Sequence, residues 1–486
     1  MTRIVVGPFN RVEGDLDVSL DIEDGVVRDA RVTAPLYRGF ETMMNDRPVL
    51  DVLTIVPRIC GICSISQSMA ASAALRGLYG LEQAPNGILA SNILHAVENL
   101  ADHLTHFYLF FMPDFTREAY AERPWHEAVA RRFSTDDGEG REAFIRARAR
   151  LMHVIGILAG KWPHTLAIQP GGTTKAINLG ERARLQALLA EFRAFFEQTV
   201  LGGRIEDFVA LSSQEALADW ALLQPADRGD FRLFLFLAVT LGLDQMGPLP
   251  LRLMSFGAYE GGRQDRHLFS PGVLDGEAGP GTIDTAAITE DLSHAWLEGE
   301  TAHPFDGMTV PERDGLTQEA YSWCKAPRLG GETCEVGAVA RQAVDGHALI
   351  RSLLERNVTT VHSRVVARIL ESARLILALE EWARNLIPGA PFSGPLGKPA
   401  SSKAFGLVEA ARGSLGHWVT LKNDRVLSYQ IIAPTTWNFS PRDASGKLGP
   451  VEKALIGTPV GSSEATPVAV QHIVRSFDPC MVCTVH

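Results

Sequence analysis

Apolar and polar positions alternate with a period of two near both ends of the chain. Between Leu16 and Ile22 every second residue is apolar, 23–25 (Glu-Asp-Gly) supplies a turn, and the alternation returns over 26–32. This period predicts a β-hairpin. A second hairpin is predicted over 417–432, with its turn at 422–424.

Most of the remaining chain follows the helical period instead. From 91 to 111 apolar residues recur every three or four positions, and the pattern stops at Pro113, which predicts a helix. Further helical segments are expected over the ranges 141–161, 181–201 (stopped by the Gly202-Gly203 pair) and 344–386. The apolar run 233–243 is too short to span a bilayer and predicts a buried helix. Residues 260–317, rich in Gly, Pro, Asp and His, predict extended surface loops.

These patterns together predict an α+β fold that is mostly α, with a central bundle of long helices and small peripheral β-sheets. We expect one large domain over 1–486. Within it, the N-terminal β region covers about 1–35, the helical core about 86–390, and a C-terminal β and loop region about 400–486.

Composition narrows the class of partner. The chain carries 46 Lys+Arg against 57 Asp+Glu, a net charge of −11, and is 46% hydrophobic. An acidic surface argues against nucleic acid and anionic membranes as main partners, since both need a basic footprint. The residues after Met1 contain no apolar signal-peptide core, so we expect no Sec-type signal. Because the apolar run 233–243 is so short, we also expect no membrane span.

Four of the six cysteines form two CxxC pairs at opposite ends of the chain, Cys60 with Cys63 and Cys480 with Cys483. The 416 residues between the pairs exclude a local zinc ribbon, whose pairs lie about 15–20 residues apart. If the four thiolates meet, they form a metal centre clamped between the two chain ends. Thiolates favour zinc, copper(I), nickel or iron.

The residue pattern alone leaves alternatives open. Either pair could be a redox pair or half of a structural zinc site, and four thiolates stapling the chain ends could make a non-enzymatic structural zinc protein. Elemental analysis separates zinc alone from nickel with iron.

The sequence around both pairs resembles the large subunit of [NiFe] hydrogenases. The two matching motifs are Arg58-Ile-Cys60-Gly-Ile-Cys63 and Asp478-Pro-Cys480-Met-Val-Cys483-Thr-Val-His486. Further matching segments spread over the whole chain and lie at residues 11–14, 37–41, 102–108, 160–164, 325–328, 412–417 and 434–438.

The resemblance implies a Ni–Fe(CN)2(CO) centre that binds and splits H2. Cys60 and Cys480 would be terminal nickel ligands, and Cys63 and Cys483 would bridge the two metals. Arg412 would lie over the open side of the metals, where a rigid guanidinium suits the role better than lysine. Asp102 and Asp478 would orient it, while Pro434 and Thr435 would lie beside the diatomic ligands, with Thr435 donating a hydrogen bond to a cyanide.

The resemblance also implies a proton path and a second metal. Heterolytic H2 cleavage releases a proton that a nearby carboxyl can relay, and Glu13 matches that glutamate. Glu41, His486 and the backbone carbonyl of Ile431 would hold Mg²⁺. Without the resemblance, Glu13 would be read as a salt-bridged surface residue and His486 as part of a frayed terminus.

Other candidate residues receive structural interpretations. We expect Arg328 to be structural, and Cys324 and Cys334 to be small buried residues. His95, His103 and His106 are expected to be hydrogen-bonded interior histidines rather than metal ligands.

Departures from the family pattern indicate a subtype. Gln67 and Asp15 stand where histidine is usual, and Ala411 stands where proline is usual. Ile62 and Phe110 replace smaller residues that line the gas route to nickel in oxygen-sensitive members. This combination resembles the H2-sensing (regulatory) hydrogenases, which are cytoplasmic and usually end at the residue equivalent to His486, so the resemblance implies a cytoplasmic location. An uptake hydrogenase that oxidises H2 for respiration is the alternative.

Electron transfer needs a partner. Two cysteines remain outside the CxxC pairs, too few for an ordinary iron–sulfur cluster. We therefore expect an iron–sulfur small subunit. For a sensor, the resemblance further implies a dimer of heterodimers and a sensor histidine kinase as signalling partner.

Overall fold

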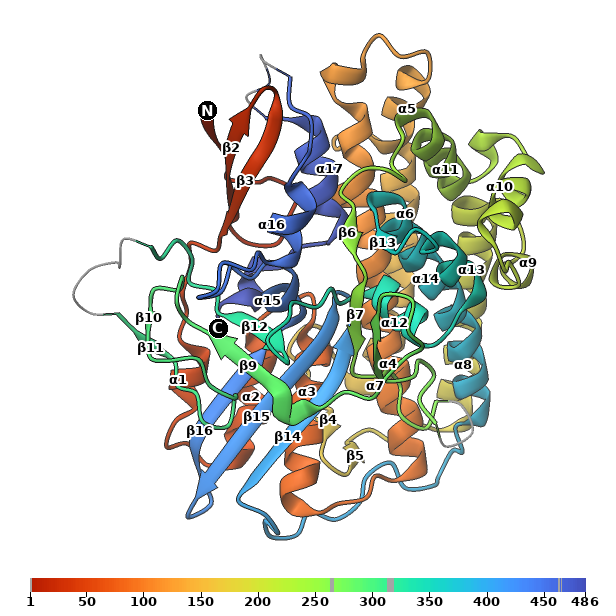
Figure 1. The fold of residues 1–486 in the computed structure, drawn as a ribbon. Helices are drawn as coiled ribbons and strands as arrows, with labels where there is room; N and C mark the ends of the chain where they lie inside the picture. Colours follow the sequence, from red (N-terminus) through yellow and green to blue (C-terminus); the bar gives the residue numbers. More distant parts are fainter. Residues whose placement is uncertain (1, 263–265, 313–318, 462–463, 465) are drawn as a thin grey trace.

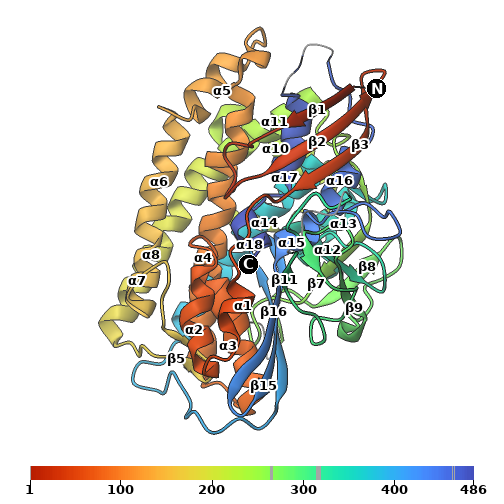
Figure 2. The ribbon, with the colours of Figure 1, turned by 90° about the vertical axis from the view of Figure 1, so that its left-hand side faces the viewer.

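The computed structural model describes residues 2–262, 266–312, 319–461, 464 and 466–486. Long helices gather on one side, and small sheets lie on the other (Figures 1 and 2). Among the longer helices are α4 (Pro85–Thr105), α6 (Glu139–Leu151), α8 (Leu179–Phe195) and α14 (Val361–Asn385). The predicted helix-rich fold with small peripheral sheets is confirmed.

Helix α4 covers the segment predicted from 91 but begins earlier, because Pro85 occupies its first turn, where a missing N–H costs nothing. The helix then continues as a π-helical turn, His106–Phe111, before Pro113. Its residues are almost all buried from Ala90 to Tyr108. This buried helix places Asp102 in the interior of the molecule.

Two other predicted helical segments are confirmed with changes of detail. The segment 141–161 divides into α6 and α7 (His153–Ala159). Helix α8 runs on through a π-helical turn to Leu201 and ends at Gly202, whose φ of 58° lies in the left-handed region that glycine tolerates.

The helical region predicted over 344–386 is confirmed, but it divides into separate helices. Between residues 338 and 385 the structure has three helices: α12 (Ala338–Val344), α13 (Ala348–Leu353) and α14. Gly346 and Asn357 adopt φ values of 84° and 59°, which interrupt a right-handed helix. Thr360 then starts α14 by accepting a hydrogen bond from Ser363 N.

Both predicted hairpins are present, each extended by a third strand. At the N-terminus β1 (Thr2–Val6), β2 (Asp17–Glu23) and β3 (Val26–Thr33) form an antiparallel sheet. The second sheet contains β14 (Lys403–Ala410), β15 (Gly413–Lys422) and β16 (Arg425–Ile432), in that order.

Strand β14 has no clean alternation, so the sequence did not predict it. Helix α3 (Ser64–Tyr79) packs directly on this strand. A Cβ at Gly406 would lie 2.0 Å from the carbonyl oxygen of Ala70, so only glycine allows this approach. The contact seats the helix that follows the first CxxC pair against the sheet that carries Arg412.

The prediction of surface loops over 260–317 is wrong for much of the described part. The segment contributes β8 (Gly272–Asp275) and β9 (Ile288–Asp291), and β9 pairs with β12 (Ala326–Leu329). Phe269 and Ile288 are fully buried. Residues 263–265 and 313–317 of that prediction lie outside the described residues.

Helix α11 (Asp230–Leu241) confirms the predicted helix around 233–243, but only one face is buried. Val239 is 86% exposed and Phe236 is 44% exposed. Across the described ranges, no helix is both long and apolar enough to cross a bilayer.

The end of the chain is more helical than the predicted β and loop region. After β16 it forms α15 (Pro434–Asn438), α16 (Pro450–Leu455), α17 (Val468–Ser476) and α18 (Met481–Thr484). The C-terminal residues lie in the interior, between the sheets and the helices (Figure 2). Glu13 pairs with Cys480 in a parallel β-bridge, which joins the two ends of the chain at the centre.

Candidate metal centre

The four CxxC thiols meet in one buried cluster. The Sγ atoms of Cys60 and Cys480 lie 3.6 Å apart, those of Cys63 and Cys483 3.0 Å apart, and those of Cys480 and Cys483 3.0 Å apart. The ligand atoms of Cys60, Cys480 and Cys483 fall within 4.8 Å of one another. Contact with the Cys480 and Cys483 thiols lowers the pKa of Cys60 well below its ordinary value.

Each pair lies where a loop turns into a helix. Cys63 is the residue before α3, and Cys480 is the residue before α18. Backbone N–H groups at helix starts favour negative charge. The main chain is fixed by Arg38, whose Nη2 donates to the carbonyls of Ile59 (2.5 Å) and Val482. The Arg38 side chain thus hydrogen-bonds to the residue before Cys60 and to the residue before Cys483, and so links the two CxxC pairs.

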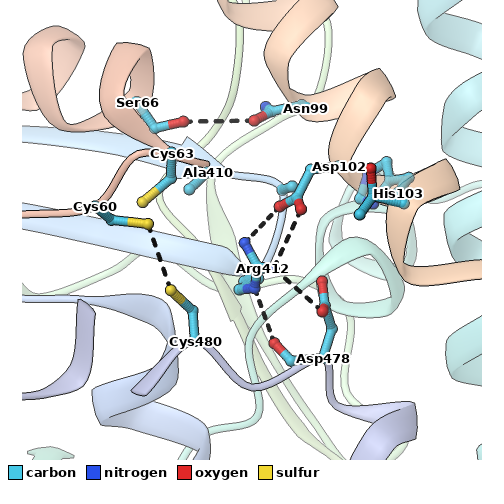
Figure 3. Close-up of polar contacts among 12 residues, drawn as sticks. Cys60, Cys63, Ser66, Asn99, Asp102, His103, Ala410, Arg412, Asp478 and Cys480 are labelled. Carbon is cyan, nitrogen blue, oxygen red and sulfur yellow. Dashed lines mark hydrogen bonds and ion pairs between the residues drawn. The ribbon is translucent and has the colours of Figure 1, made fainter. Parts of the chain in front are cut away.

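The side chain of Arg412 lies beside the cysteine cluster and is held by the side chains of Asp102 and Asp478 (Figure 3). Its Nη1 and Nη2 donate to the two oxygens of Asp102 at 2.5 and 3.1 Å. Asp478 accepts from Nη2 at 3.3 Å through its side chain and from Nε at 3.0 Å through its backbone carbonyl. All three side chains are buried, so the predicted arginine and its two orienting carboxylates are brought together.

The electrostatics keep Arg412 charged. Burial opposes the charge, but Asp102, Asp478 and the thiolates of Cys480 and Cys60 raise the pKa of Arg412 well above its ordinary value. Burial also opposes the charge of Asp478, yet Arg412 holds the pKa of that carboxyl below its ordinary value. A permanent cation therefore faces the thiol cluster.

Glu13 reaches the same cluster through its backbone. Met481 N donates to Glu13 O at 2.7 Å, and Glu13 N donates to Pro479 O at 3.5 Å. The carboxyl is half-buried, and burial together with the charge of Cys60 raises its pKa. A raised pKa favours the protonated form that a relay group needs.

The three predicted Mg²⁺ ligands also meet. His486 Nε2 lies 2.7 Å from Ile431 O and 3.7 Å from Glu41 Oε1, and Nδ1 lies 2.7 Å from Cys483 O. Burial lowers the pKa of His486, and a neutral imidazole has only one N–H for these two carbonyls. A cation between Nε2, Ile431 O and Glu41 would satisfy all three, so the residues fit the implied metal.

Thr435 and Pro434 begin α15 beside the second CxxC pair. Cys480 N donates to Thr435 Oγ1 at 3.1 Å, which leaves the hydroxyl hydrogen free to donate as the resemblance implies. The four buried thiols fit the nickel–iron centre because soft ligands select soft metals.

The two predicted gas-route residues lie in different elements. Ile62 is half-buried between the first two cysteines and packs on the apolar cluster that contains all four ligands. Phe110 is half-buried in the turn after α4, and its carbonyl accepts from Arg11 at 3.1 Å. Their joint action as a gate stays a prediction.

The structure agrees with these structural interpretations. Arg328 is buried and pairs with Asp443 at 2.8 Å, and Cys324 and Cys334 lie in two other apolar clusters. His103 and His106 contact Glu371 and the carbonyl of Arg475. His95 is buried and hydrogen-bonds to the backbone of Glu409, while its Nε2 has no partner among the described residues.

Several polar residues around the centre were not predicted, because each acts through a contact far away in sequence. Lys325 Nζ lies 3.4 Å from Glu41 and 3.3 Å from Glu290. Glu98 of α4 accepts from the backbone N–H groups of Ile65 and Ser66, both at 2.8 Å, and so caps the helix that follows Cys63. The signals in the sequence were weak: Lys325 lies in the matching segment 325–328, and Glu98 is a charged residue in a segment with a helical period of apolar positions.

A buried cluster of four thiols facing a clamped arginine defines a candidate metal centre. Residues 38–138 and 243–486 match the family described as nickel-dependent hydrogenase. The periplasmic [NiFeSe] hydrogenase large subunit of Desulfomicrobium baculatum is 28% identical over 100% of this chain and 95% of that protein. The uptake hydrogenase large subunit of Afipia carboxidovorans is 26% identical, with the same coverages of 100% and 95%.

Solved structures agree with the sequence comparisons. The reduced Ni-Fe-Se hydrogenase of D. vulgaris Hildenborough superposes with a TM-score of 0.83 at 27% identity, covering 100% of both chains. The chain belongs to the nickel-dependent hydrogenase family and is a hydrogenase large subunit that handles H2. This assignment replaces the structural zinc alternative.

Proposed function

We propose that this chain splits H2 heterolytically at a Ni–Fe(CN)2(CO) centre bound by its four CxxC cysteines, with Mg²⁺ held beside it. The observation that carries the proposal is the clamped Arg412 facing the four sulfurs. When bound, the metal pair supplies the Lewis acidity that polarises H2 and accepts its electrons.

Arg412 would polarise and orient the substrate. A guanidinium has five N–H donors, and the four contacts to Asp102 and Asp478 leave one hydrogen on Nη1. That hydrogen can point at the space above the sulfurs. Because the pair with Asp102 is bidentate, the guanidinium plane is fixed while this donor stays available.

Glu13 would take the released proton away from the cysteines. Its main chain is bonded to the residues on both sides of Cys480, so the residue is anchored beside the cluster. The raised pKa of the Glu13 carboxyl lies closer to neutral pH than that of an ordinary glutamate, so the group can both take up and release a proton there.

Infrared spectroscopy with elemental analysis tests the centre. Purified holoenzyme should show CN and CO stretches and near-equal nickel and iron. Zinc alone, without these bands, contradicts the proposal. Arg412→Lys should keep the bands but lower H2/D⁺ exchange by orders of magnitude, and near-normal exchange would remove Arg412 from the mechanism.

Mg²⁺ is tested separately through His486→Ala. Removing the imidazole takes away one of three candidate ligands, so about one magnesium per chain should be lost on gel filtration. An unchanged magnesium content in the variant would show that the ion binds elsewhere.

The electrons would leave through an iron–sulfur small subunit. Cys324 and Cys334 are buried in two different clusters, and an ordinary cluster takes four cysteines. Co-expression with an iron–sulfur small subunit of a hydrogenase should yield a heterodimer carrying iron–sulfur absorbance.

For the subtype we favour a cytoplasmic H2 sensor that assembles as a dimer of heterodimers and signals to a histidine kinase. Gln67, Asp15, Ile62 and Phe110 support it. The relatives named as uptake hydrogenases support the alternative of respiratory H2 oxidation. H2-dependent change of kinase autophosphorylation in the reconstituted complex supports the sensor; fast electron delivery to a quinone or cytochrome supports the uptake enzyme.

A further inference from the structure

Arg341 in α12 is completely buried and uses every donor of its guanidinium. Nε and Nη2 donate to the two oxygens of Glu371 at 2.9 and 2.7 Å. Nη1 donates to Glu409 Oε2 at 2.8 Å. The remaining two hydrogens go to backbone carbonyls, from Nη1 to Ala410 and from Nη2 to Ala411, both at 2.8 Å. Five N–H groups thus meet five acceptor atoms.

The two carbonyls belong to the turn that presents Arg412. Strands β14 and β15 pair as far as Ala410 with Gly413, so Ala411 and Arg412 form a two-residue hairpin turn. Loop tips are usually the least constrained part of a hairpin. Here the tip is buried, and the carbonyls of the two residues before Arg412 both accept hydrogen bonds from Arg341.

The turn also packs closely on the start of α12. A Cβ at Gly413, whose φ is 133°, would lie 2.6 Å from Val336 Cγ2 and 2.7 Å from Gly337 N. No larger residue fits without moving one of the two segments. The helix that carries Arg341 and the turn that carries Arg412 therefore form one packed unit.

The carboxylates extend the same unit to the partner of Arg412. Glu371 in α14 also contacts His103 Nε2 at 3.0 Å, and His103 follows Asp102 in α4. Arg341 is thus bonded to the backbone beside Arg412 and, through Glu371 and His103, to the helix that presents Asp102.

We infer that Arg341 is a positioning residue for H2 activation, which fixes the Ala411–Arg412 turn and aligns it with Asp102. This inference rests on the proposed role of Arg412. Only a planar five-donor fork satisfies both carboxylates and both carbonyls, because lysine has three donors at one nitrogen.

The test compares Arg341→Lys with Arg328→Lys in the holoenzyme. Arg328 is equally buried and also binds a carboxylate and backbone carbonyls, but those belong to the segment 440–447. Arg341→Lys should keep nickel, iron and the infrared bands while H2/D⁺ exchange falls roughly tenfold to a hundredfold, as for a misplaced reacting group. The KM for H2 should change much less than kcat. Arg328→Lys should keep near-normal exchange.

A second variant covers failure of assembly. Glu371→Gln keeps Arg341 and the side-chain volume but weakens the group that orients the fork, so exchange should fall to an intermediate value. Normal exchange in a fully metallated Arg341→Lys protein overturns the inference; if that protein does not assemble, normal exchange in Glu371→Gln does. Arg412→Lys is measured alongside. If Arg412→Lys exchanges H2 with D⁺ normally, the proposed function is wrong. If Arg412→Lys loses this exchange while Arg341→Lys keeps it, only the inference about Arg341 is wrong.

Discussion

At the scale of single residues, we expect the proposed bridging ligands Cys63 and Cys483 to be the least replaceable side chains. Cys63 and Cys483 lie 3.0 Å apart inside the cluster, and a neutral hydroxyl is a poor ligand for soft nickel. We expect Cys63→Ser or Cys483→Ser to abolish assembly of the centre, measured as nickel and iron per chain. A serine variant that is fully loaded and active would contradict the four-thiolate assignment.

Glu13→Gln separates proton transfer from metal binding. The amide has nearly the shape of the carboxyl but cannot take up and release a proton at neutral pH. The backbone bridge to Cys480 does not involve the side chain, so metal content and infrared bands should stay normal while exchange of H2 with solvent deuterium collapses. Unchanged exchange would mean that protons leave through another group.

The predicted gas gate depends on two side chains acting together. Ile62→Val with Phe110→Leu removes volume from a narrow passage, which should admit O2 more than the smaller H2. We expect the double variant to activate H2 without air but to lose activity after exposure to air. If both residues only pack, Ile62→Val costs about 0.5–1.5 kcal/mol of stability without a change in oxygen response. Dye-linked H2 oxidation before and after air, with a melting curve, distinguishes the outcomes.

At the scale of elements, the helix caps set stability without touching the chemistry. Thr360 starts α14 through a reciprocal pair of hydrogen bonds with Ser363, and the site is buried. Thr360→Ala should cost about 1–2 kcal/mol, seen as a lower Tm with near-normal H2/D⁺ exchange, because Glu371 lies three turns further along. Ser213→Ala, which removes the cap of α10 (Gln214–Leu222), is the matched peripheral control. A collapse of exchange in Thr360→Ala alone would show that α14 transmits the change to Arg341.

At the scale of the whole molecule, the centre closes a loop of nearly the full chain. Ligands at 60–63 and 480–483 and the bridge from Glu13 to Cys480 tie the two ends together. Metal binding to such a site contributes to folding stability. Protein made without nickel should therefore exchange amide hydrogens faster over 8–16 and 476–486, while α4 stays protected. Equal protection with and without metals would show that the protein contacts alone hold the ends.

Local patterns determined much of this molecule. The alternation at Leu16–Ile22, the helical periods that became α4 and α8, and the turn at Asn423-Asp424 all depend on residues a few positions apart. Asn423 and Asp424 have φ values of 54° and 60°, as the tight hairpin turn predicts. The candidate ligands were identified because the motifs around them resemble those of a known family.

The tertiary structure alone decided how the ligands are held. Strand β14 exists because α3 and β15 cover it, and Arg341, Arg38, Glu98 and Lys325 act through partners dozens to hundreds of positions away. No periodicity records such pairs, since a charged residue in an apolar stretch looks the same whether its partner is water or a buried carboxylate. Burial makes the difference, because a charge removed from water must find its partners inside the fold.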